Sequence, residues 1–133
     1  MSKVLLITDQ HFGVRNDNIH YVERYRKFYT DTVLPFIDKE GITEILNLGD
    51  TFDRRKAINF SSLEAAKEMW FRPLQERGIK QTILLGNHDI YFKNTLRVNS
   101  PELCLGEFDN IEIIYCPGER VIGGKLMLLV PWI

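Results

Sequence analysis

The sequence predicts an α/β fold in which a mainly parallel sheet is flanked by helices. Short apolar segments, typical of buried strands, alternate with longer segments whose apolar residues recur every three or four positions. Strand–helix–strand units of this length favour right-handed crossovers and parallel strands covered by helices. The expected strands cover 4–8, 44–48, 81–85 and 111–115, and the expected helices cover 18–39 and 61–77.

Local signals set the ends of the two helices. The first helix contains Pro35, expected to kink its last turn, and Gly41 is its expected stop. The run Ser61-Ser62-Leu63-Glu64 has the form of a capping box, which predicts that the second helix begins there. Pro73 is expected to bend or interrupt this helix, and Gly78 to end it.

Two further elements are expected in the last third of the chain. Ser100-Pro101-Glu102 is typical of the start of a short helix. Gly123-Gly124 lies between the segments 120–122 and 125–130, which predicts a β-hairpin. No repeats, linkers or low-complexity segments break the pattern, so we expect the 133 residues to form part or all of one domain.

Composition excludes several classes of protein. Apolar residues make up 44% and charged residues 26%, which is unlike a disordered chain or a fibre. The net charge of −1 excludes binding to nucleic acid through bulk positive charge, although a local basic patch is compatible with it. Cys104 and Cys116 are expected to be free thiols in a reducing compartment. The apolar run at 4–7 is too short for a signal peptide or membrane span, so we expect a cytoplasmic protein without membrane contact.

Polar clusters follow the first three expected strands. They are Asp9-Gln10-His11, Gly49-Asp50-Thr51-Phe52-Asp53-Arg54 and Gly86-Asn87-His88-Asp89. Because the carboxyl ends of parallel strands meet at one edge of a sheet, we expect the three clusters to lie together. Carboxylates with imidazole form a ligand set for Mn, Fe or Zn, and Asp50 is well placed to bridge two ions. Gly49 and Gly86 would let the backbone turn sharply and approach the site.

Structural interpretations exist for each cluster alone. Asp-x-His is a common triplet, Gly-Asp after a strand is an ordinary turn, and Asp53-Arg54 is compatible with a surface ion pair. Gly-Asn-His-Asp is rarer, expected by chance in roughly one in a few thousand chains of this length. Because all three clusters directly follow expected strands, we favour a functional site over three unrelated structural roles.

These clusters resemble the first three motifs of the calcineurin-like metallophosphoesterases. The spacing is similar too, with 41 residues from Asp9 to Asp50 and 37 from Asp50 to Asn87. His11-Phe12-Gly13 resembles the SbcD-type nucleases. The run from Asp50 to Ala57, and Pro131-Trp132 near the end, resemble the recombination endonuclease subunit of T-even-type phages. The resemblance implies that the chain forms the first half of a β-sandwich metallophosphoesterase domain.

The resemblance also implies roles for individual residues. Asp9 and His11 would bind one metal ion, Asp50 both ions and Asn87 the second, while Asp53 would support a ligand. His88 would face the scissile phosphate and stabilise or protonate it, and Asp89 would orient His88. Two cations about 4 Å apart can clamp a phosphodiester and lower the pKa of an attacking water, and Mn²⁺ is the expected ion.

A nuclease would also contact the DNA backbone. Arg54, Arg55 and Lys56 follow the Asp50 motif and Arg15 follows the first motif, so they are candidate phosphate contacts; a solvated charged loop is the alternative. His20 is expected to be an ordinary helix residue, and Trp70 and Phe71 are expected in the core.

The leading hypothesis is therefore a Mn-dependent DNA nuclease subunit acting at DNA ends in recombination and repair. The resemblance implies a coiled-coil ABC-type ATPase partner (SbcC-like). It implies a location in the host cytoplasm if the protein is phage-encoded. A homodimer is also compatible with it. One alternative is a phosphatase or small-molecule phosphodiesterase, which Asn87-His88-Asp89 and Arg54-Arg55 disfavour. The other is a degenerate, non-catalytic binding module.

The family pattern calls for further histidines beyond the three present here, His11, His20 and His88. We therefore expect residues 1–133 to be the N-terminal portion of one nuclease domain, incomplete at its C-terminus. Such a fragment is expected to be poorly active by itself.

Overall fold

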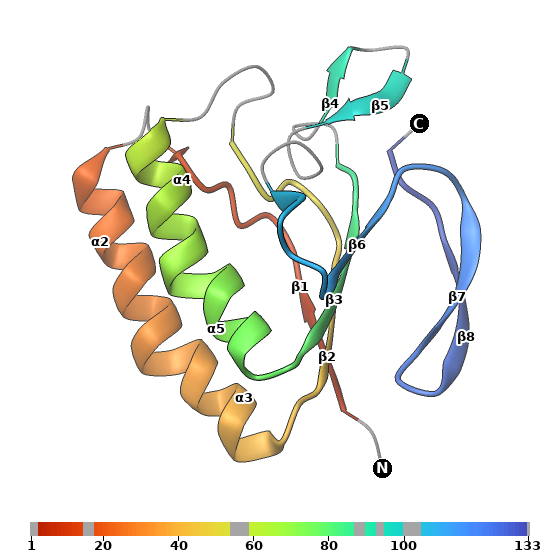
Figure 1. The fold of residues 1–133 in the computed structure, drawn as a ribbon, viewed down its shortest axis with the longest axis horizontal. Helices are drawn as coiled ribbons and strands as arrows, with labels where there is room; N and C mark the ends of the chain where they lie inside the picture. Colours follow the sequence, from red (N-terminus) through yellow and green to blue (C-terminus); the bar gives the residue numbers. More distant parts are fainter. Residues whose placement is uncertain are drawn as a thin grey trace.

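The computed structural model describes residues 3–14, 18–53, 59–86, 90–92, 95–99 and 105–132, with the backbone alone for 90–92 and 95–99. Four parallel strands form the central sheet in the order β1-β2-β3-β6, which confirms the expected fold class. They run upward in Figure 1, so the loops that follow them lie at the upper edge. The strands of this sheet are β1 (Val4–Ile7), β2 (Glu44–Asn47), β3 (Lys80–Leu84) and β6 (Ile111–Ile114).

The sheet is the middle of three layers. Helical segments cover one face and the hairpin of β7 and β8 lies on the other (Figure 1). A second small hairpin, formed by β4 and β5, was not expected from the sequence and lies near the upper edge of the sheet. The hairpin strands are β4 (Ile90–Phe92), β5 (Thr95–Asn99), β7 (Gly118–Ile122) and β8 (Lys125–Leu129).

The first crossover is one continuous helical segment that changes its winding. It consists of α2 (Ile19–Phe28), a π-helical turn η1 (Tyr29–Val33) and α3 (Leu34–Glu40). Asn18 caps its start by accepting the backbone N–H of His20 at 2.9 Å, and Gly41 ends it as expected. Pro35 lies in the first turn of α3, directly after the π turn. The wider turn removes the need for the hydrogen bond that a proline cannot donate, so the helix continues past it.

The second crossover begins earlier than its sequence signal predicts. It runs through α4 (Phe60–Ala66), η2 (Lys67–Phe71) and α5 (Arg72–Glu76). Asn59, not Ser61, is the capping residue, because its side chain accepts the Ser61 N–H at 2.8 Å. The capping-box prediction was therefore wrong: Asn is as good a cap as Ser, and Glu64 pairs with Arg72 instead. A π turn again precedes the proline, so Pro73 does not interrupt the segment.

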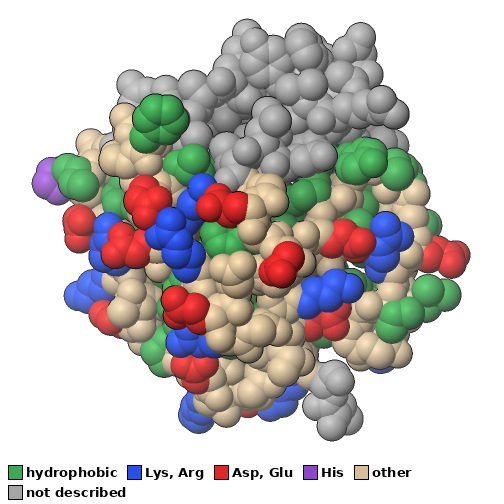
Figure 2. Space-filling model, viewed as in Figure 1, with side chains coloured by type: hydrophobic (Ala, Val, Ile, Leu, Met, Phe, Trp, Pro, Cys, Tyr) green, Lys and Arg blue, Asp and Glu red, His purple; other side chains and the backbone are tan. Residues whose placement is uncertain are grey.

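The main hydrophobic core lies between these helices and the sheet. Trp70 and Phe71 are fully buried there, as expected, together with Ile45 and Ile83 from the central strands. On the visible face, side chains of both charges are interspersed over the helices (Figure 2), and several form ion pairs such as Arg77–Asp38. The described part of this face therefore offers no basic stripe. No helix in the described ranges is long and apolar enough to cross a membrane.

The opposite face of the sheet is only partly covered. The turn at Gly123-Gly124 joins β7 to β8 as predicted, and Ile122 and Leu129 of this hairpin pack on Leu46 and Leu84. The expectation that the first strand is buried was wrong, because Leu6 is 60% exposed. Within the described sheet β1 is an edge strand, and the hairpin reaches Val4 but leaves Leu6 open.

Other expectations can be placed only in part. Cys116 is an exposed free thiol, as expected. His20 lies exposed on α2, as an ordinary helix residue. The expected helix start at 100–102 and Cys104 lie outside the described residues.

The backbones that follow β2 and β3 touch at two glycines. A Cβ atom on Gly49 would lie 2.7 Å from the Gly86 nitrogen and 2.9 Å from the Leu84 oxygen. A Cβ atom on Gly86 would overlap the Asp50 carboxylate and lie 2.8 Å from the Asp50 nitrogen. Both positions therefore require glycine for close approach, as predicted, and the contact joins two of the polar clusters.

Removing a buried phenylalanine ring should lower the free energy of unfolding far more than removing an exposed one. We expect Phe71→Ala to lower the free energy of unfolding by about 3–5 kcal/mol, because the ring is fully buried. Phe60→Ala is the matched control, since that ring is 89% exposed, and should change it by less than about 0.5 kcal/mol. Urea unfolding followed by circular dichroism measures both values, and equal losses would contradict the assigned core.

Adding one methyl group at the glycine contact should destabilise the fold. We expect Gly86→Ala to cost about 1–3 kcal/mol, because the new methyl group has no space beside Asp50. Gly118→Ala is the control, since its Cβ would meet only the flexible Arg120 guanidinium at 3.3 Å. The same unfolding measurement applies, and an unchanged midpoint for Gly86→Ala would show that the two loops are not in contact.

Candidate metal centre

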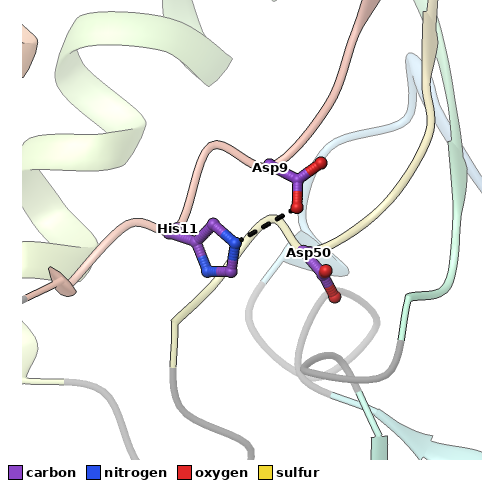
Figure 3. Close-up of side chains that lie close together, drawn as sticks. All are labelled: Asp9, His11 and Asp50. Carbon is purple, nitrogen blue, oxygen red and sulfur yellow. Dashed lines mark hydrogen bonds and ion pairs between the residues drawn. The ribbon is translucent and has the colours of Figure 1, made fainter.

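Three of the predicted ligands lie together at the carboxyl edge of the sheet. Asp9 and His11 follow β1 and Asp50 follows β2 (Figure 3). Each offers a ligand atom such that all three atoms lie within 4.8 Å of one another. The Nε2 atom of His11 is 3.3 Å from Oδ1 of Asp9. The structure therefore brings the first two polar clusters to one point.

Backbone hydrogen bonds continue the pairing of β1 with β2 into the loops. Asp9 donates its N–H to the Gly49 carbonyl at 3.0 Å, and His11 donates to the Asp50 carbonyl at 3.0 Å. One step further, the Phe12 N–H bonds to Thr51 at 2.8 Å. These bonds connect the two loops residue by residue, so the candidate ligands stay side by side after the strands end.

The backbone at these ligands is strained. Asp9, His11 and Asp50 have φ angles of 54°, 49° and 55°, and among the described residues no other non-glycine residue has a positive φ. This conformation costs about 1–3 kcal/mol per residue and persists only where the surroundings impose it. Asp and His tolerate it better than most residue types. Strain confined to three potential metal ligands favours a functional role for their placement.

Two buried aromatic rings anchor the loops to the core. Phe12 follows His11, Phe52 precedes Asp53, and the two residues form an isolated parallel bridge. The Phe12 ring lies 5.7 Å from the Tyr29 ring and 5.9 Å from the Phe71 ring, centre to centre. Packing against both helical segments therefore anchors the loops to the hydrophobic core.

The electrostatics of the cluster keep Asp9 ionised. The Thr8 hydroxyl donates to Asp9 at 2.7 Å, and this hydrogen bond, assisted by His11, holds the pKa of the Asp9 carboxyl below its ordinary value. Asp53 approaches the other side of the His11 ring, with its Oδ1 atom 3.1 Å from Nδ1. A carboxylate at Nδ1 leaves Nε2 facing the cluster, which is the orientation that a metal ligand requires.

The donor set fits a divalent transition metal. Two carboxylates and one imidazole are typical ligands of Mn, Fe or Zn. Two ligand atoms of one ion lie at most about 4.4 Å apart, which is twice a metal–ligand bond of about 2.2 Å. The three ligand atoms here lie within 4.8 Å of one another, which is close to that limit. The Asp9 side chain is 57% exposed and borders an open groove of about 320 Å³ between the end of β1 and α2, so solvent can reach it.

Seven predicted site residues lie outside the described residues. They are the candidate metal ligand Asn87, the candidate catalytic pair His88 and Asp89, and the candidate phosphate contacts Arg15, Arg54, Arg55 and Lys56. Gly86, which directly precedes Asn87, touches Asp50, so the third cluster starts beside the other two.

Sequence reasoning missed a set of buried polar side chains beneath the loops. Gln10, Asn47 and Gln81 are buried, and Asn47 donates hydrogen bonds to both glutamines. The available signal was a polar residue inside an otherwise apolar strand, as in Ile45-Leu46-Asn47. Such residues need internal partners, which the sequence alone does not identify.

Comparisons with known proteins agree with this geometry. The chain is 33% identical over 133 residues to "Exonuclease subunit 1" of Enterobacteria phage T4, covering 98% of this chain and 38% of that protein. It is also 33% identical over 119 residues to "DNA double-strand break repair protein Mre11" of Sulfurisphaera tokodaii, covering 87% of this chain and 29% of that protein. The chain thus spans about a third of the length of these curated relatives.

A solved structure supports the fold. Nuclease MPE of Pseudomonas putida superposes with a TM-score of 0.56 at 19% identity, over 84% of this chain and 46% of that one. The family model of the calcineurin-like phosphoesterases matches residues 2–125, nearly the whole chain. With the first two polar clusters at one sheet edge and this match, the chain belongs to the calcineurin-like phosphoesterase family.

Proposed function

We propose that this chain forms the metal-binding part of a metal-dependent DNA nuclease of the SbcD type, which hydrolyses phosphodiester bonds at DNA ends. The observation that carries the proposal is the strained cluster of Asp9, His11 and Asp50 in a chain of this family. The names of the two curated relatives, an exonuclease subunit and a double-strand break repair protein, support DNA as the substrate.

The ligand atoms suggest a division of roles. Asp9 and His11 would hold one ion, and Asp50, in the centre of the edge, would be shared by two ions with Asn87 on the second. Asp53 would keep the His11 ring in place through its contact with Nδ1. Bound divalent cations, Mn²⁺ above all, would neutralise the charge developing on the phosphodiester and lower the pKa of an attacking water.

Proton transfer and substrate positioning would fall to residues in or shortly after the three polar clusters of the sequence. His88 would face the scissile phosphate and deliver a proton to the leaving 3′-oxygen, with Asp89 orienting its ring. Arg15, Arg54, Arg55 and Lys56 would contact phosphates along the strand, which positions DNA without reading its sequence. We further propose a coiled-coil ABC-type ATPase partner and a cytoplasmic location.

Removing the shared carboxylate should weaken metal binding. We expect Asp50→Asn to weaken Mn²⁺ binding by about 10–100-fold in calorimetric titration, because the amide lacks the charge that attracts a cation. Asp31→Asn, an exposed aspartate of η1, is the control and should bind like the unchanged chain.

The same variants test the function with linear duplex DNA and a phosphate monoester as substrates. We expect slow hydrolysis of DNA that needs Mn²⁺ and is lost in Asp50→Asn. Hydrolysis of the monoester in preference to DNA would favour a phosphatase, and absence of Mn²⁺ binding would favour a non-catalytic module.

Replacing His88 should affect DNA hydrolysis but not metal binding. We expect His88→Ala to remove DNA hydrolysis while the Mn²⁺ stoichiometry stays unchanged, because His88 is assigned to the phosphate. His20→Ala, on the exposed face of α2, is the matched control and should alter neither quantity. Loss of one equivalent of Mn²⁺ in His88→Ala would make His88 a ligand and contradict this assignment.

A further inference from the structure

Four buried polar side chains form a hydrogen-bond network beneath the candidate metal centre. Gln10 donates through Nε2 to the Tyr29 hydroxyl at 2.8 Å, and its Oε1 accepts from Nδ2 of Asn47 at 2.8 Å. The same Nδ2 group of Asn47 donates to Oε1 of Gln81 at 3.1 Å. All four residues are at most 4% exposed. Solvent therefore cannot replace these bonds when one is lost.

Asn47 is the centre of this network and contacts both loops of the site. Gln10 stands between Asp9 and His11, so its bond to Asn47 reaches the first loop. The Oδ1 atom of Asn47 accepts the N–H of Gly49 at 3.0 Å, and Gly49 directly precedes Asp50. One amide thus uses its donor toward one loop and its acceptor toward the other.

We propose that Asn47 and Gln10 are positioning residues that set the spacing of Asp9, His11 and Asp50 and so tune metal affinity. The ligands themselves have strained backbone, which relaxes unless something fixes it. The main-chain bonds between the loops fix their register, whereas the network fixes their depth relative to β2 and the helix that carries Tyr29. The part of the inference that concerns metal affinity rests on the proposed function.

The network has a chemical reason to act as one unit. A buried amide that loses its partner leaves a donor or acceptor unsatisfied, which is costly, so the remaining groups rearrange. Loss of Gln10 removes one of the two acceptors of the Asn47 Nδ2 group, which keeps its bond to Gln81. Loss of Asn47 removes the donor to Oε1 of Gln10 and to Oε1 of Gln81, and the acceptor of the Gly49 N–H. Either change should therefore disturb both loops.

The test compares three variants with a matched control in the metal-free and Mn²⁺-loaded chain. Gln10→Met and Asn47→Leu remove the hydrogen bonds at nearly constant volume, and Tyr29→Phe removes a single hydroxyl as a mild variant in case the others fail to fold. Thr82→Val is the control, because Thr82 is fully buried in the neighbouring strand β3 and its hydroxyl has no hydrogen-bond partner among the described residues.

Amide hydrogen exchange of the metal-free chain reports on the loops alone. We expect Gln10→Met and Asn47→Leu to accelerate exchange at the Asp9 and His11 amides by about tenfold relative to core strand amides, with a smaller increase in Tyr29→Phe. Thr82→Val should leave the ratio of loop to core exchange unchanged. A uniform increase across the sheet, or none, would overturn the positioning role, because general destabilisation does not single out the loops.

Mn²⁺ titration of the folded variants reports on the site. We expect Gln10→Met and Asn47→Leu each to weaken binding by about 10–100-fold, the double variant no further than the stronger single variant, and Thr82→Val to stay within twofold. Unchanged affinity in both single variants would refute the effect on metal binding. If the unchanged chain itself binds no Mn²⁺, the proposed function fails, while hydrogen exchange still decides whether the network positions the loops.

Discussion

The parallel pairing of β1 with β2 is the interaction on which the site depends. In a parallel pair both strands end at the same edge, and here the hydrogen bonds continue beyond that edge. The Leu48 N–H bonds to Ile7 at 2.8 Å, and the Asp9 N–H then bonds to Gly49. These backbone hydrogen bonds extend the strand pairing into the two loops. The main chain therefore holds Asp9 and Asp50 together independently of any contact between their side chains. Changes to this pairing would separate the candidate ligands.

The backbone strain at the ligands explains why several buried residues contact the two loops. A positive φ at Asp9, His11 and Asp50 opposes folding, so stabilising contacts elsewhere must offset it. The Phe12 ring supplies apolar contact with two helical segments, and Asn47 supplies hydrogen bonds in a region without solvent. Aromatic packing resists outward movement of the loops, while the amide bonds are directional and resist sliding. The two kinds of contact therefore constrain different motions of the same residues.

The two faces of the sheet contribute unequally to this arrangement. The helix side carries the large aromatic core that supports the site, whereas the hairpin side buries a smaller cluster around Leu46 and Leu84. The segment after the hairpin nevertheless returns to the edge that carries the candidate site, because the Trp132 N–H bonds to the Leu85 carbonyl at 2.8 Å. This bond lies one residue before Gly86, and Gly86 touches Asp50. The end of the described chain is thereby tied to the third polar cluster.

The sequence by itself determined the central strands, their parallel direction and the clustering of Asp9, His11 and Asp50, because apolar periodicity and polar strand ends can be recognised in local sequence. The order of the strands in the sheet came from the structure. The tertiary structure alone decided the exposure of Leu6, which depends on how far the hairpin extends over the sheet. It also decided the helix start at Asn59, where two local caps competed. The same holds for the bond between Gln10 and Asn47, which are 37 residues apart. A buried polar residue signals that it needs a partner, but which residue provides it depends on how the chain packs in three dimensions.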